Sequence, residues 1–478
     1  MEISSKTART GVGFVPFEPM RKHAGGFDVT LARHKSEPWH FRVEENHRYG
    51  QLTASTKSDF DPAELENSRG KFIAGTLVKS MLTSSAAARK LAARLGISSQ
   101  DITLAGNKDR TAVTAQMFVI SNPNVKFEDV LRLSEPDERN LREEGFFIKD
   151  IRRATKPLRK GYLEGNRFTL KTLHPGMSQA DLVAYLDPRL NHLRNGLCGD
   201  TTSVIMSNFF GYQRLGRRQN LLGVGFDFIL RGVEAAAKRF CCEVVEENDH
   251  PLATQLRKKL AQLWQQAEEA AVRKGEPVAK QHHDFIEMLR VLEEPEPNPR
   301  GRFRRPSYEP ANMFIEHKLI KKIAKMQNFE EAFLEMRDDV SLWVGAVQGY
   351  WFNQALGKLI EGELPQEALE RNPRTGENCF PLFFAGDNTS VEWYRRWMPE
   401  AIPEYVDPFV FRHFLSNADG SPGPRRPVYV PVGDLTMEPH NESILMRFVL
   451  RRGSYATVFL GLLFNLDGKD FEAIGASA

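Results

Sequence analysis

The residues with the clearest chemical potential lie in the polar segment Ala105–Gln116, which reads AGNKDRTAVTAQ. The residues before it, Ile102–Leu104, and those from Ala112 to Ile120 are rich in β-branched and apolar side chains, which predicts two strands. The connection between them holds Asp109 at the tip of a strand pair, with a cation on each side. Flanking cations favour the ionised carboxylate, and a fixed anionic oxygen suits proton abstraction or nucleophilic attack at carbon. A solvated polar turn is the alternative interpretation.

Several elements are expected to position this loop. Phe41, Val43 and Glu45 alternate on one face, as a strand requires. A polar loop over 46–70 separates this strand from another that ends at Lys79. A helix is then predicted between the cap candidates at Thr83–Ser85 and a stop at Gly96, leading directly into the Asp109 loop.

A second stretch, Ser207–Gly216, interleaves aromatic residues with an amide, an arginine and glycines. Recognition of single-stranded RNA uses this mixture. A flipped base stacks on a ring, and amide or guanidinium groups hold its polar edge or its phosphate. An aromatic run is also typical of a protein core, so packing is the alternative interpretation.

The Asp109 segment resembles the signature Gly-Thr-Lys-Asp-Arg-x-Ala-x-Thr-x-Gln of the TruD family of pseudouridine synthases, with Asn107 in place of the threonine. This resemblance implies that Asp109 is the catalytic carboxylate. The segment that begins at Lys35 is similar to the family's element Lys-x-x-Pro-x-x-Phe-x-Val-x-Glu. That similarity implies that Lys35 is the basic partner of the catalytic carboxylate and that Phe41 lines the substrate pocket.

The resemblance implies four more substrate-binding residues. Lys79 matches a basic residue that precedes a helix in the family, although a surface lysine is the alternative. The second stretch resembles Asn-Tyr/Phe-Phe-Gly-x-Gln-Arg-Phe-Gly, with Leu215 in place of the last phenylalanine. It implies that Phe210 lies against the target base and that Asn208 positions the catalytic carboxylate or the nucleotide. Arg214 is assigned to substrate binding too, with a structural role in a turn as the alternative.

The fold class that the resemblance implies is α+β, with a mixed-sheet pseudouridine synthase catalytic domain and an inserted α/β TRUD domain. The apolar strand 444–450 and the element after it are similar to the family's C-terminal motif Arg-Phe-x-Leu-x-x-Gly-Ser-Tyr/Phe-Ala-Thr. Both ends of the chain would therefore build the catalytic domain. The predicted boundaries are an extended lead-in over 1–27, a catalytic domain over 28–221 and 431–478, and an inserted domain over 222–430, in which 240–310 is extra helical and linker material.

Composition limits the class of protein. A chain of 478 residues with 41% hydrophobic and 27% charged residues is typical of a globular protein with two domains. A net charge of +3 means that any nucleic-acid surface must gather positive charge into patches. No stretch is long and apolar enough to span a membrane, and the N-terminus is unlike a signal peptide. Four cysteines without Cys-x-x-Cys spacing predict neither a zinc ribbon nor a disulfide framework, which fits a reducing cytoplasm. We also expect a monomer.

The predicted function is isomerisation of uridine to pseudouridine in RNA, with tRNA position 13 as the site that the resemblance implies. No metal or organic cofactor is expected, because nothing is oxidised and no group arrives from outside. Asp109 would act by attack on ribose C1′ or by removal of the C2′ proton. The alternatives are a carboxylate-dependent hydrolase that releases the base, and an RNA-binding or chaperone protein of the same fold.

Overall fold

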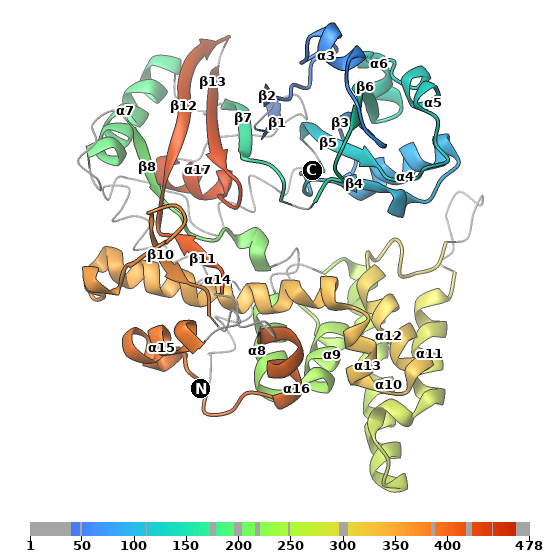
Figure 1. Cartoon of the computed structure of the whole chain (residues 1–478). Coiled ribbons are helices and arrows are strands. Elements are labelled where there is room, and N and C mark those ends of the chain that lie inside the picture. Colours follow the sequence, from blue (N-terminus) through green and yellow to red (C-terminus); the bar gives the residue numbers. More distant parts are fainter. Residues whose placement is uncertain are drawn as a thin grey trace. The chain divides into compact units, whose positions relative to one another are not determined.

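The computed structural model describes residues 40–47, 50–110, 112–159, 161–172, 178–195, 203–215, 220–246, 249–295, 305–383, 388–416, 423–441 and 443–464. The chain divides into two units. His23–Asn208 and Tyr429–Ala478 form one, the sheet unit, and Met1–Lys22 and Phe209–Val428 form the other, the helical unit (Figure 1). The assignment of catalytic and inserted domains to these units stays a prediction.

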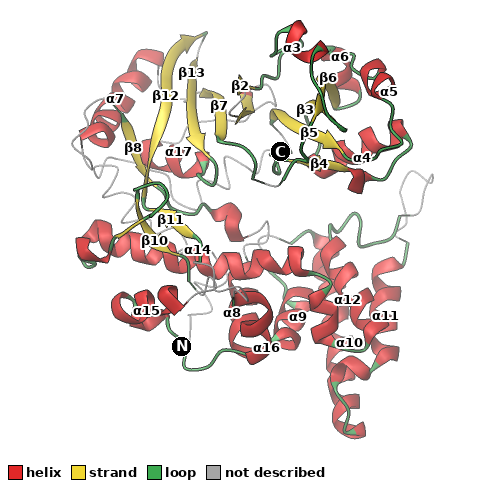
Figure 2. Ribbon diagram, viewed as in Figure 1, coloured by secondary structure: helices red, strands yellow, loops and turns green. Residues whose placement is uncertain are grey.

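The sheet unit is organised around a ten-stranded sheet with the order β6-β3-β5-β1-β7-β13-β12-β8, with β2 beside β1 and β4 beside β5 (Figure 2). The β1–β5 pair is parallel. The other pairs in the described part of this sheet are antiparallel, so the predicted mixed sheet is confirmed. Its strands are β1 (Phe41–His47), β2 (Gly50–Gln51), β3 (Phe72–Lys79), β4 (Ile102–Leu104), β5 (Val113–Ile120), β6 (Phe146–Ala154), β7 (Gly165–Thr172), β8 (Val204–Ser207), β12 (Tyr429–His440) and β13 (Ser443–Arg451).

The two ends of the chain share this sheet, because β12 and β13 lie between β7 and β8. The helices of the sheet unit are α3 (Pro62–Glu66), α4 (Ser84–Leu95), α5 (Phe127–Arg132), α6 (Glu138–Glu143), α7 (Gln179–Asn195) and α17 (Ala456–Phe464). Helix α4 begins and ends where the sequence predicts. The Thr83 side chain accepts a hydrogen bond from the backbone N–H of Ala86, and Gly96 ends the helix in the left-handed conformation at φ 67°.

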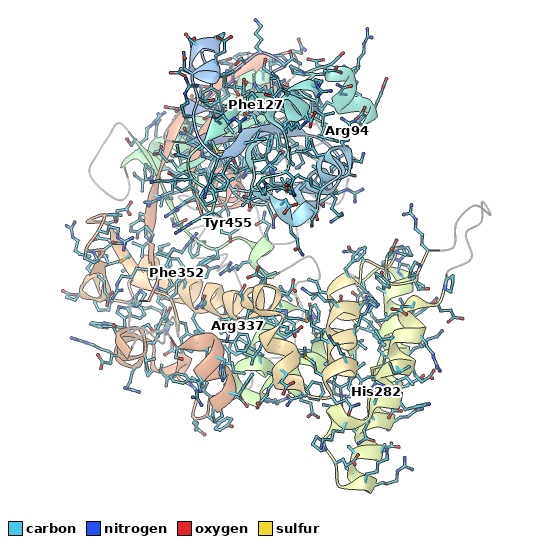
Figure 3. All side chains as sticks on the ribbon, turned by 45° about the vertical axis from the view of Figure 1, so that its right-hand side comes forward. Arg94, Phe127, His282, Arg337, Phe352 and Tyr455 are labelled. Atoms are coloured by element: carbon cyan, nitrogen blue, oxygen red, sulfur yellow. The ribbon has the colours of Figure 1, made fainter. Side chains whose placement is uncertain are left out.

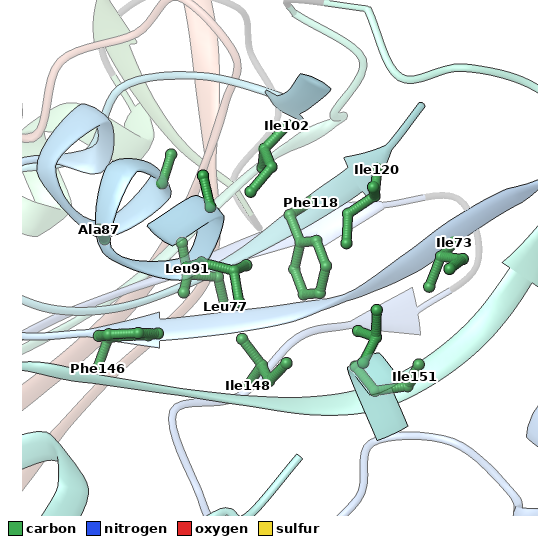
Figure 4. Packing of buried hydrophobic residues seen from close by; sticks show 13 residues of the cluster. Ile73, Leu77, Ala87, Leu91, Ile102, Phe118, Ile120, Phe146, Ile148 and Ile151 are labelled. Atoms are coloured by element: carbon green, nitrogen blue, oxygen red, sulfur yellow. The ribbon is translucent and has the colours of Figure 1, made fainter. Parts of the chain in front are cut away.

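The two faces of the sheet are covered differently along its width. On one face of β3, β5 and β6, a hydrophobic cluster packs Leu77, Phe118 and Ile148 against Leu91 of α4 (Figure 4). A second cluster covers the opposite face of the same strands. Across β1, β7 and β13, a ladder of aromatic rings joins Phe41, Phe168 and Phe448 to Phe459 of α17, on the same face as α4, with ring centroids 6.3, 5.2 and 4.8 Å apart.

The reverse face of β7 and β13 is only half buried, because buried and partly exposed residues alternate along both strands. We call the face that carries Lys79, Glu45 and Phe168 the loop face, and the opposite face of β1, β7 and β13 the open face. The strand registers define them. Lys79 and Val43 both pair with Thr114 on the loop face, whereas Arg42 and Arg447 both pair with Thr169 on the open face.

The helical unit surrounds an aromatic core in which Trp343 contacts Phe228, Phe240 and Phe333. Its elements are α8 (Leu221–Arg231), α9 (Val233–Cys242), α10 (Pro251–Lys274), α11 (His282–Glu293), α12 (Phe314–Met326), α13 (Phe329–Leu334), α14 (Arg337–Glu361), α15 (Asn388–Trp397) and α16 (Pro408–Val410), with the antiparallel strands β9 (Glu370–Arg371), β10 (Asn378–Pro381) and β11 (Arg425–Pro427). Buried Arg257 of α10 contacts the Phe240 carbonyl oxygen at 2.8 Å and pairs with Glu316 of α12 at 2.5 Å, so α10 is packed into this unit.

Candidate active site

Asp109 lies in the loop between β4 and β5, where the sequence predicts it. The predicted strands on either side are confirmed as Ile102–Leu104 and Val113–Ile120. Because Val113 pairs with Arg42, this loop enters the sheet beside the start of β1. Asp109 itself is exposed, whereas Val113 at the start of β5 is buried and Leu104 at the end of β4 is partly buried. The loop therefore presents a carboxylate to the surroundings from a rigid sheet edge.

Lys79 approaches this loop from the end of β3. Its side chain is fully buried, and its ammonium group donates a hydrogen bond to the carbonyl oxygen of Asp109. Burial lowers the pKa of Lys79 to about 8, because the charged form loses hydration. The Asp109 carboxylate opposes this decrease and the Lys108 charge adds to it. Lys79 is thus a cation whose charge depends on the carboxylate beside it.

Lys108 anchors the other side of the loop. Its ammonium nitrogen lies 2.6 Å from Oε1 of Glu45, whose side chain is completely buried. Oε2 of the same carboxylate accepts a 2.9 Å hydrogen bond from the Met117 backbone N–H and lies 2.9 Å from Nε2 of His47. Burial alone would raise the pKa of Glu45, but His47 and Lys108 outweigh it and lower that pKa. The result is an ionised pair that ties the loop to β1.

The first residue of α4 completes the anchor. The backbone N–H of Lys108 donates a 2.9 Å hydrogen bond to Oγ of Ser84, and this hydroxyl donates to Oε1 of Gln116 at 3.0 Å. Gln116 is the last residue of the motif that the sequence singles out. Among the described residues, Nε2 of Gln116 and Oγ1 of Thr114 are buried without a hydrogen-bond partner. The site therefore holds polar groups beyond those that fix the loop.

A cavity of about 870 Å³ borders the loop at Gly106–Lys108. Its walls include Arg89 of α4, Asn166 of β7 and the turn at Arg452–Gly453. Within the described part of the chain, Oδ1 of Asn166 is buried and unpartnered. The two arginines suit an anionic group such as a phosphate, and the amide oxygen of Asn166 can accept a hydrogen bond from a donor on the same ligand.

The predicted site residues of the sheet unit lie in different surroundings. Lys79 and Phe41 lie at the end of the sheet where β1 begins, and Lys79 contacts Asp109. The Phe41 ring is buried and stacks on Phe168. Asn208 is also buried and follows β8, at the end of the sheet where β13 ends. Lys35 lies outside the described residues.

Phe210 and Arg214 belong to the helical unit, where the structure gives both of them packing contacts. Phe210 is 5% exposed. Its backbone N–H donates to Oδ1 of Asn353 at 2.8 Å, and its ring meets Phe352 of α14 edge-on, a residue labelled in Figure 3. The guanidinium carbon of Arg426 lies 3.9 Å from the centre of this ring, and that of Arg214 lies 5.2 Å away. Contact of either residue with the substrate stays a prediction.

The sequence prediction missed Glu45 and Ser84 as determinants of the loop. A signal for Glu45 was present, because an acidic residue alternates there with Phe41 and Val43 on an otherwise apolar face. Such a residue requires a buried partner of opposite charge. Ser84 gave no comparable signal, since a serine at a helix start is usually a cap.

The described ranges contain neither a candidate metal site nor a candidate membrane-spanning helix. No group of histidine, cysteine, aspartate or glutamate residues there has the arrangement of a metal site, and His282 instead contacts the Ala324 carbonyl oxygen at 2.9 Å. In that same part of the chain, no helix combines the length and the apolar character needed to cross a membrane.

The amino-acid sequence matches a known protein family. The family model described as tRNA pseudouridine synthase D (TruD) matches residues 20–296. A probable tRNA pseudouridine synthase D 2 from Methanococcus maripaludis is 24% identical over 90% of this chain and 94% of its own. A tRNA pseudouridine synthase D from a Geobacter species is 25% identical over 87% and 97%.

A solved structure supports the fold. The crystal structure of the putative tRNA pseudouridine synthase D from Methanosarcina mazei matches with a TM-score of 0.51 and 18% sequence identity, over 93% of this chain and 96% of that one. At this identity the likeness concerns the fold alone. The family model covers more than half of the chain, and the chain therefore belongs to the TruD family.

Proposed function

We propose that this protein isomerises uridine to pseudouridine in tRNA, with Asp109 as the catalytic carboxylate. The observation that carries the proposal is the loop geometry. Asp109 lies at the tip of a strand pair. Buried Lys79 donates a hydrogen bond to its backbone carbonyl oxygen, and the Lys108–Glu45 pair anchors the adjacent residue of the loop. The family match and the relatives named as tRNA pseudouridine synthases support the same reaction.

The reaction breaks the bond between uracil N1 and ribose C1′, turns the detached base, and joins its C5 to C1′. The proton on C5 leaves and N1 gains one, so no oxidant, reductant or added group enters. Asp109 serves this sequence either by attack on C1′ or by removal of the C2′ proton, and either route needs the ionised form. The exposed position of Asp109 leaves it accessible to a nucleotide extruded from its stack.

The surrounding cations would support the carboxylate without touching the base. Lys79 donates a hydrogen bond to the Asp109 carbonyl oxygen and brings a positive charge close to the Asp109 carboxylate. Lys108 and Glu45 fix the loop, and a fixed loop limits the motion of the reacting oxygen. Lys35 is proposed as a further basic partner, in accordance with the family motif.

The remaining predicted contacts belong to the same proposal. Phe41, Asn208, Phe210 and Arg214 are proposed to contact or orient the target nucleotide, and position 13 of tRNA is proposed as the target. The reaction requires no cofactor, and the enzyme is proposed to act as a monomer in the cytoplasm.

Purified protein and a tRNA transcript with uridine at position 13 test the proposal. Mass spectrometry of the digested RNA should find pseudouridine at that position and no free uracil. A transcript with cytidine at position 13 serves as the matched control and should remain unmodified. Release of free uracil would instead support a base-releasing hydrolase, and intact uridine after saturating binding would support an RNA-binding protein without catalysis.

A further inference from the structure

We propose that the open face of the sheet carries a second RNA-binding surface, which holds phosphates of a tRNA segment remote from the target uridine. The open face lies on the reverse side of the strands that position Asp109. A groove of about 460 Å³ crosses it, and its walls are formed by His40, Arg42, Glu44, Arg167, Thr169, Lys171, His440, Leu445 and Arg447. This inference rests on the proposed function for the identity of the RNA.

The strand registers place the cations of this groove at three successive positions along β7, beside Arg167, Thr169 and Lys171. Arg42 of β1 and Arg447 of β13 both pair with Thr169 of β7, which places them in one row across three strands. Lys171 and Arg167 lie two residues to either side of Thr169 on the same face. Because two residues of a strand span about 6.7 Å, the charges extend over roughly 13 Å. A line of cations fits a continuous backbone better than a single phosphate group.

The charges of this row are largely uncompensated. Within the ranges that the structure describes, Arg42, Arg167 and Lys171 form no ion pair, whereas Arg447 pairs with Glu438 at 2.7 Å. Exposed lysine and arginine residues usually find a neighbouring acid or face water alone. Three unpaired cations gathered in one groove give the local positive potential that the net charge of the chain does not show.

The groove has one acidic wall residue, Glu44, against the four cationic residues Arg42, Arg167, Lys171 and Arg447, so its walls keep an excess of positive charge. Glu44 is 8% exposed, and its Oε1 accepts a 2.8 Å hydrogen bond from the Ala54 backbone N–H. Burial raises the pKa of Glu44, although Ala54, Arg42 and Arg167 oppose the increase. Glu44 is thus held by the Ala54 N–H and largely shielded from solvent, and it attracts Arg42 and Arg167 without forming an ion pair with either among the described residues.

The chemistry of the walls favours RNA over a protein partner. Leu445 is the only apolar side chain among the nine lining residues, whereas the core of a protein interface needs apolar and aromatic anchors. Threonine and histidine side chains between the cations can donate hydrogen bonds to phosphate and ribose oxygens. The groove and the residues that anchor the Asp109 loop, Lys79 and Glu45, lie on opposite faces of the sheet. We therefore expect a short RNA seated at the loop to leave the groove empty, and a longer RNA to reach both.

Binding titrations at several salt concentrations test this surface. The variant Arg42→Gln/Arg167→Gln/Lys171→Gln is compared with a matched control, Arg69→Gln/Arg132→Gln/Arg139→Gln, which removes three exposed cations of the same unit. With intact tRNA, the first variant should lose affinity on the order of ten-fold near 0.1 M salt, and the slope of log K against log salt should decrease by about 2 to 3. The control should resemble the wild type.

A short stem-loop that carries the target uridine provides the second arm. The open-face variant should bind it as tightly as the wild type does, because that RNA reaches only the loop face. Equal losses for both RNAs, or an unchanged salt slope with tRNA, would overturn the proposal. A higher melting temperature of the wild type in millimolar inorganic phosphate, together with tRNA affinity that is the same in the variant and the wild type, would mean that the groove binds a small anion and not RNA.

Thermal melting checks that the variants are folded, and the single change Lys171→Glu replaces the triple variant if that one melts early. The test is independent of catalysis. A wild-type protein that made no pseudouridine would refute the proposed function and leave this comparison valid. A normal isomerase with an unchanged salt slope would refute only the second surface.

Discussion

The two faces of one sheet use charge in opposite ways. On the loop face, Lys108 and Glu45 are buried and paired at 2.6 Å, and Lys79 is buried against the Asp109 backbone. On the open face, Arg42 and Arg167 are accessible and, among the described residues, without an ion pair. Buried charges that are paired fix geometry, whereas accessible unpaired charges are available to a ligand.

Two consecutive residues make the contrast sharpest. Burial raises the pKa of Glu44 on the open face, and the partners Ala54, Arg42 and Arg167 do not overcome it. Burial acts on Glu45 in the same direction, but His47 and Lys108 reverse the result and lower its pKa. The alternation of a strand therefore gives two adjacent carboxyl groups opposite electrostatic properties. Both carboxyl groups accept a hydrogen bond from a backbone N–H, so the difference lies in the His47 and Lys108 side chains, which contact Glu45 directly.

The largest expected effect comes from Asp109→Asn. The change keeps the size of the side chain and removes its charge, so the pseudouridine rate should fall at least about a thousand-fold. Binding of tRNA should persist, because the open face and the cavity walls are untouched. Single-turnover rates and filter binding measure both quantities. The control is Asp129→Asn, an exposed aspartate that pairs with Arg132, and it should retain activity. Substantial product from Asp109→Asn would remove Asp109 from the chemistry.

The next effect concerns the free energy of unfolding, which should fall much more when an ion pair is broken on the loop face than when one is broken on the open face. Glu45→Gln leaves the Lys108 ammonium group, which is 6% exposed, without its carboxylate. Loss of one partner of a buried pair costs about 3–5 kcal/mol in the free energy of unfolding. Glu438→Gln removes the partner of Arg447 on the open face, where both side chains are exposed by 40% or more. That change should cost about 0–1 kcal/mol.

Urea denaturation at pH 7 measures both values. Equal losses in the two variants would contradict the contrast between the faces. A large loss of activity in Glu45→Gln at a temperature where it is fully folded would show that the pair also positions Asp109.

The elements around Asp109 could be predicted because each has a local signal. Apolar β-branched runs gave the strands on either side of the loop, and Thr83 and Gly96 gave the limits of α4. The segment 46–70, predicted as a loop, contains the strand β2 and the helix α3. Both are too short to show the hydrophobic periodicity from which strands and helices are predicted.

The pairing of Lys108 with Glu45 could not be read from the chain, since 63 residues separate them and only the parallel β1–β5 pair brings them together. Phe210 shows the same limit. Its aromatic neighbours predict a base contact, which stays a prediction, whereas its hydrogen-bond partner Asn353 is 143 residues away on α14 and could not be read from the sequence. Residue types thus gave the candidate side chains, and long-range topology decided what those side chains contact.

Lys79 should give stability a pH dependence of its own. Its pKa is about 8 in the folded protein, below the ordinary value of 10.5. Between these values the unfolded chain binds more protons than the folded one, so the contribution of Lys79 to stability rises as pH increases from about 8 to 10.5. The shift corresponds to roughly 3 kcal/mol. Lys79→Met should lack this rise. The measurement is the difference in unfolding free energy between the two proteins at pH 7, 9 and 10.5, and a constant difference would contradict it.

The smallest expected effect concerns Glu44, and its sign is opposite to that of Glu45. Because the folded-state pKa of Glu44 is raised, the folded protein binds more protons than the unfolded chain in the window just above pH 4.5, and stability falls as pH rises through it. Glu44→Gln removes that loss and keeps an oxygen for the Ala54 N–H, so it should stabilise the protein at pH 7 by on the order of 0.5 kcal/mol. At pH 4 the gain should disappear.

The same change makes the open face more positive, so tRNA should bind slightly more tightly and with a steeper salt dependence. Destabilisation at pH 7 would mean that Arg42 and Arg167 depend on the Glu44 charge, and the groove would then be a neutralised surface and not an RNA site.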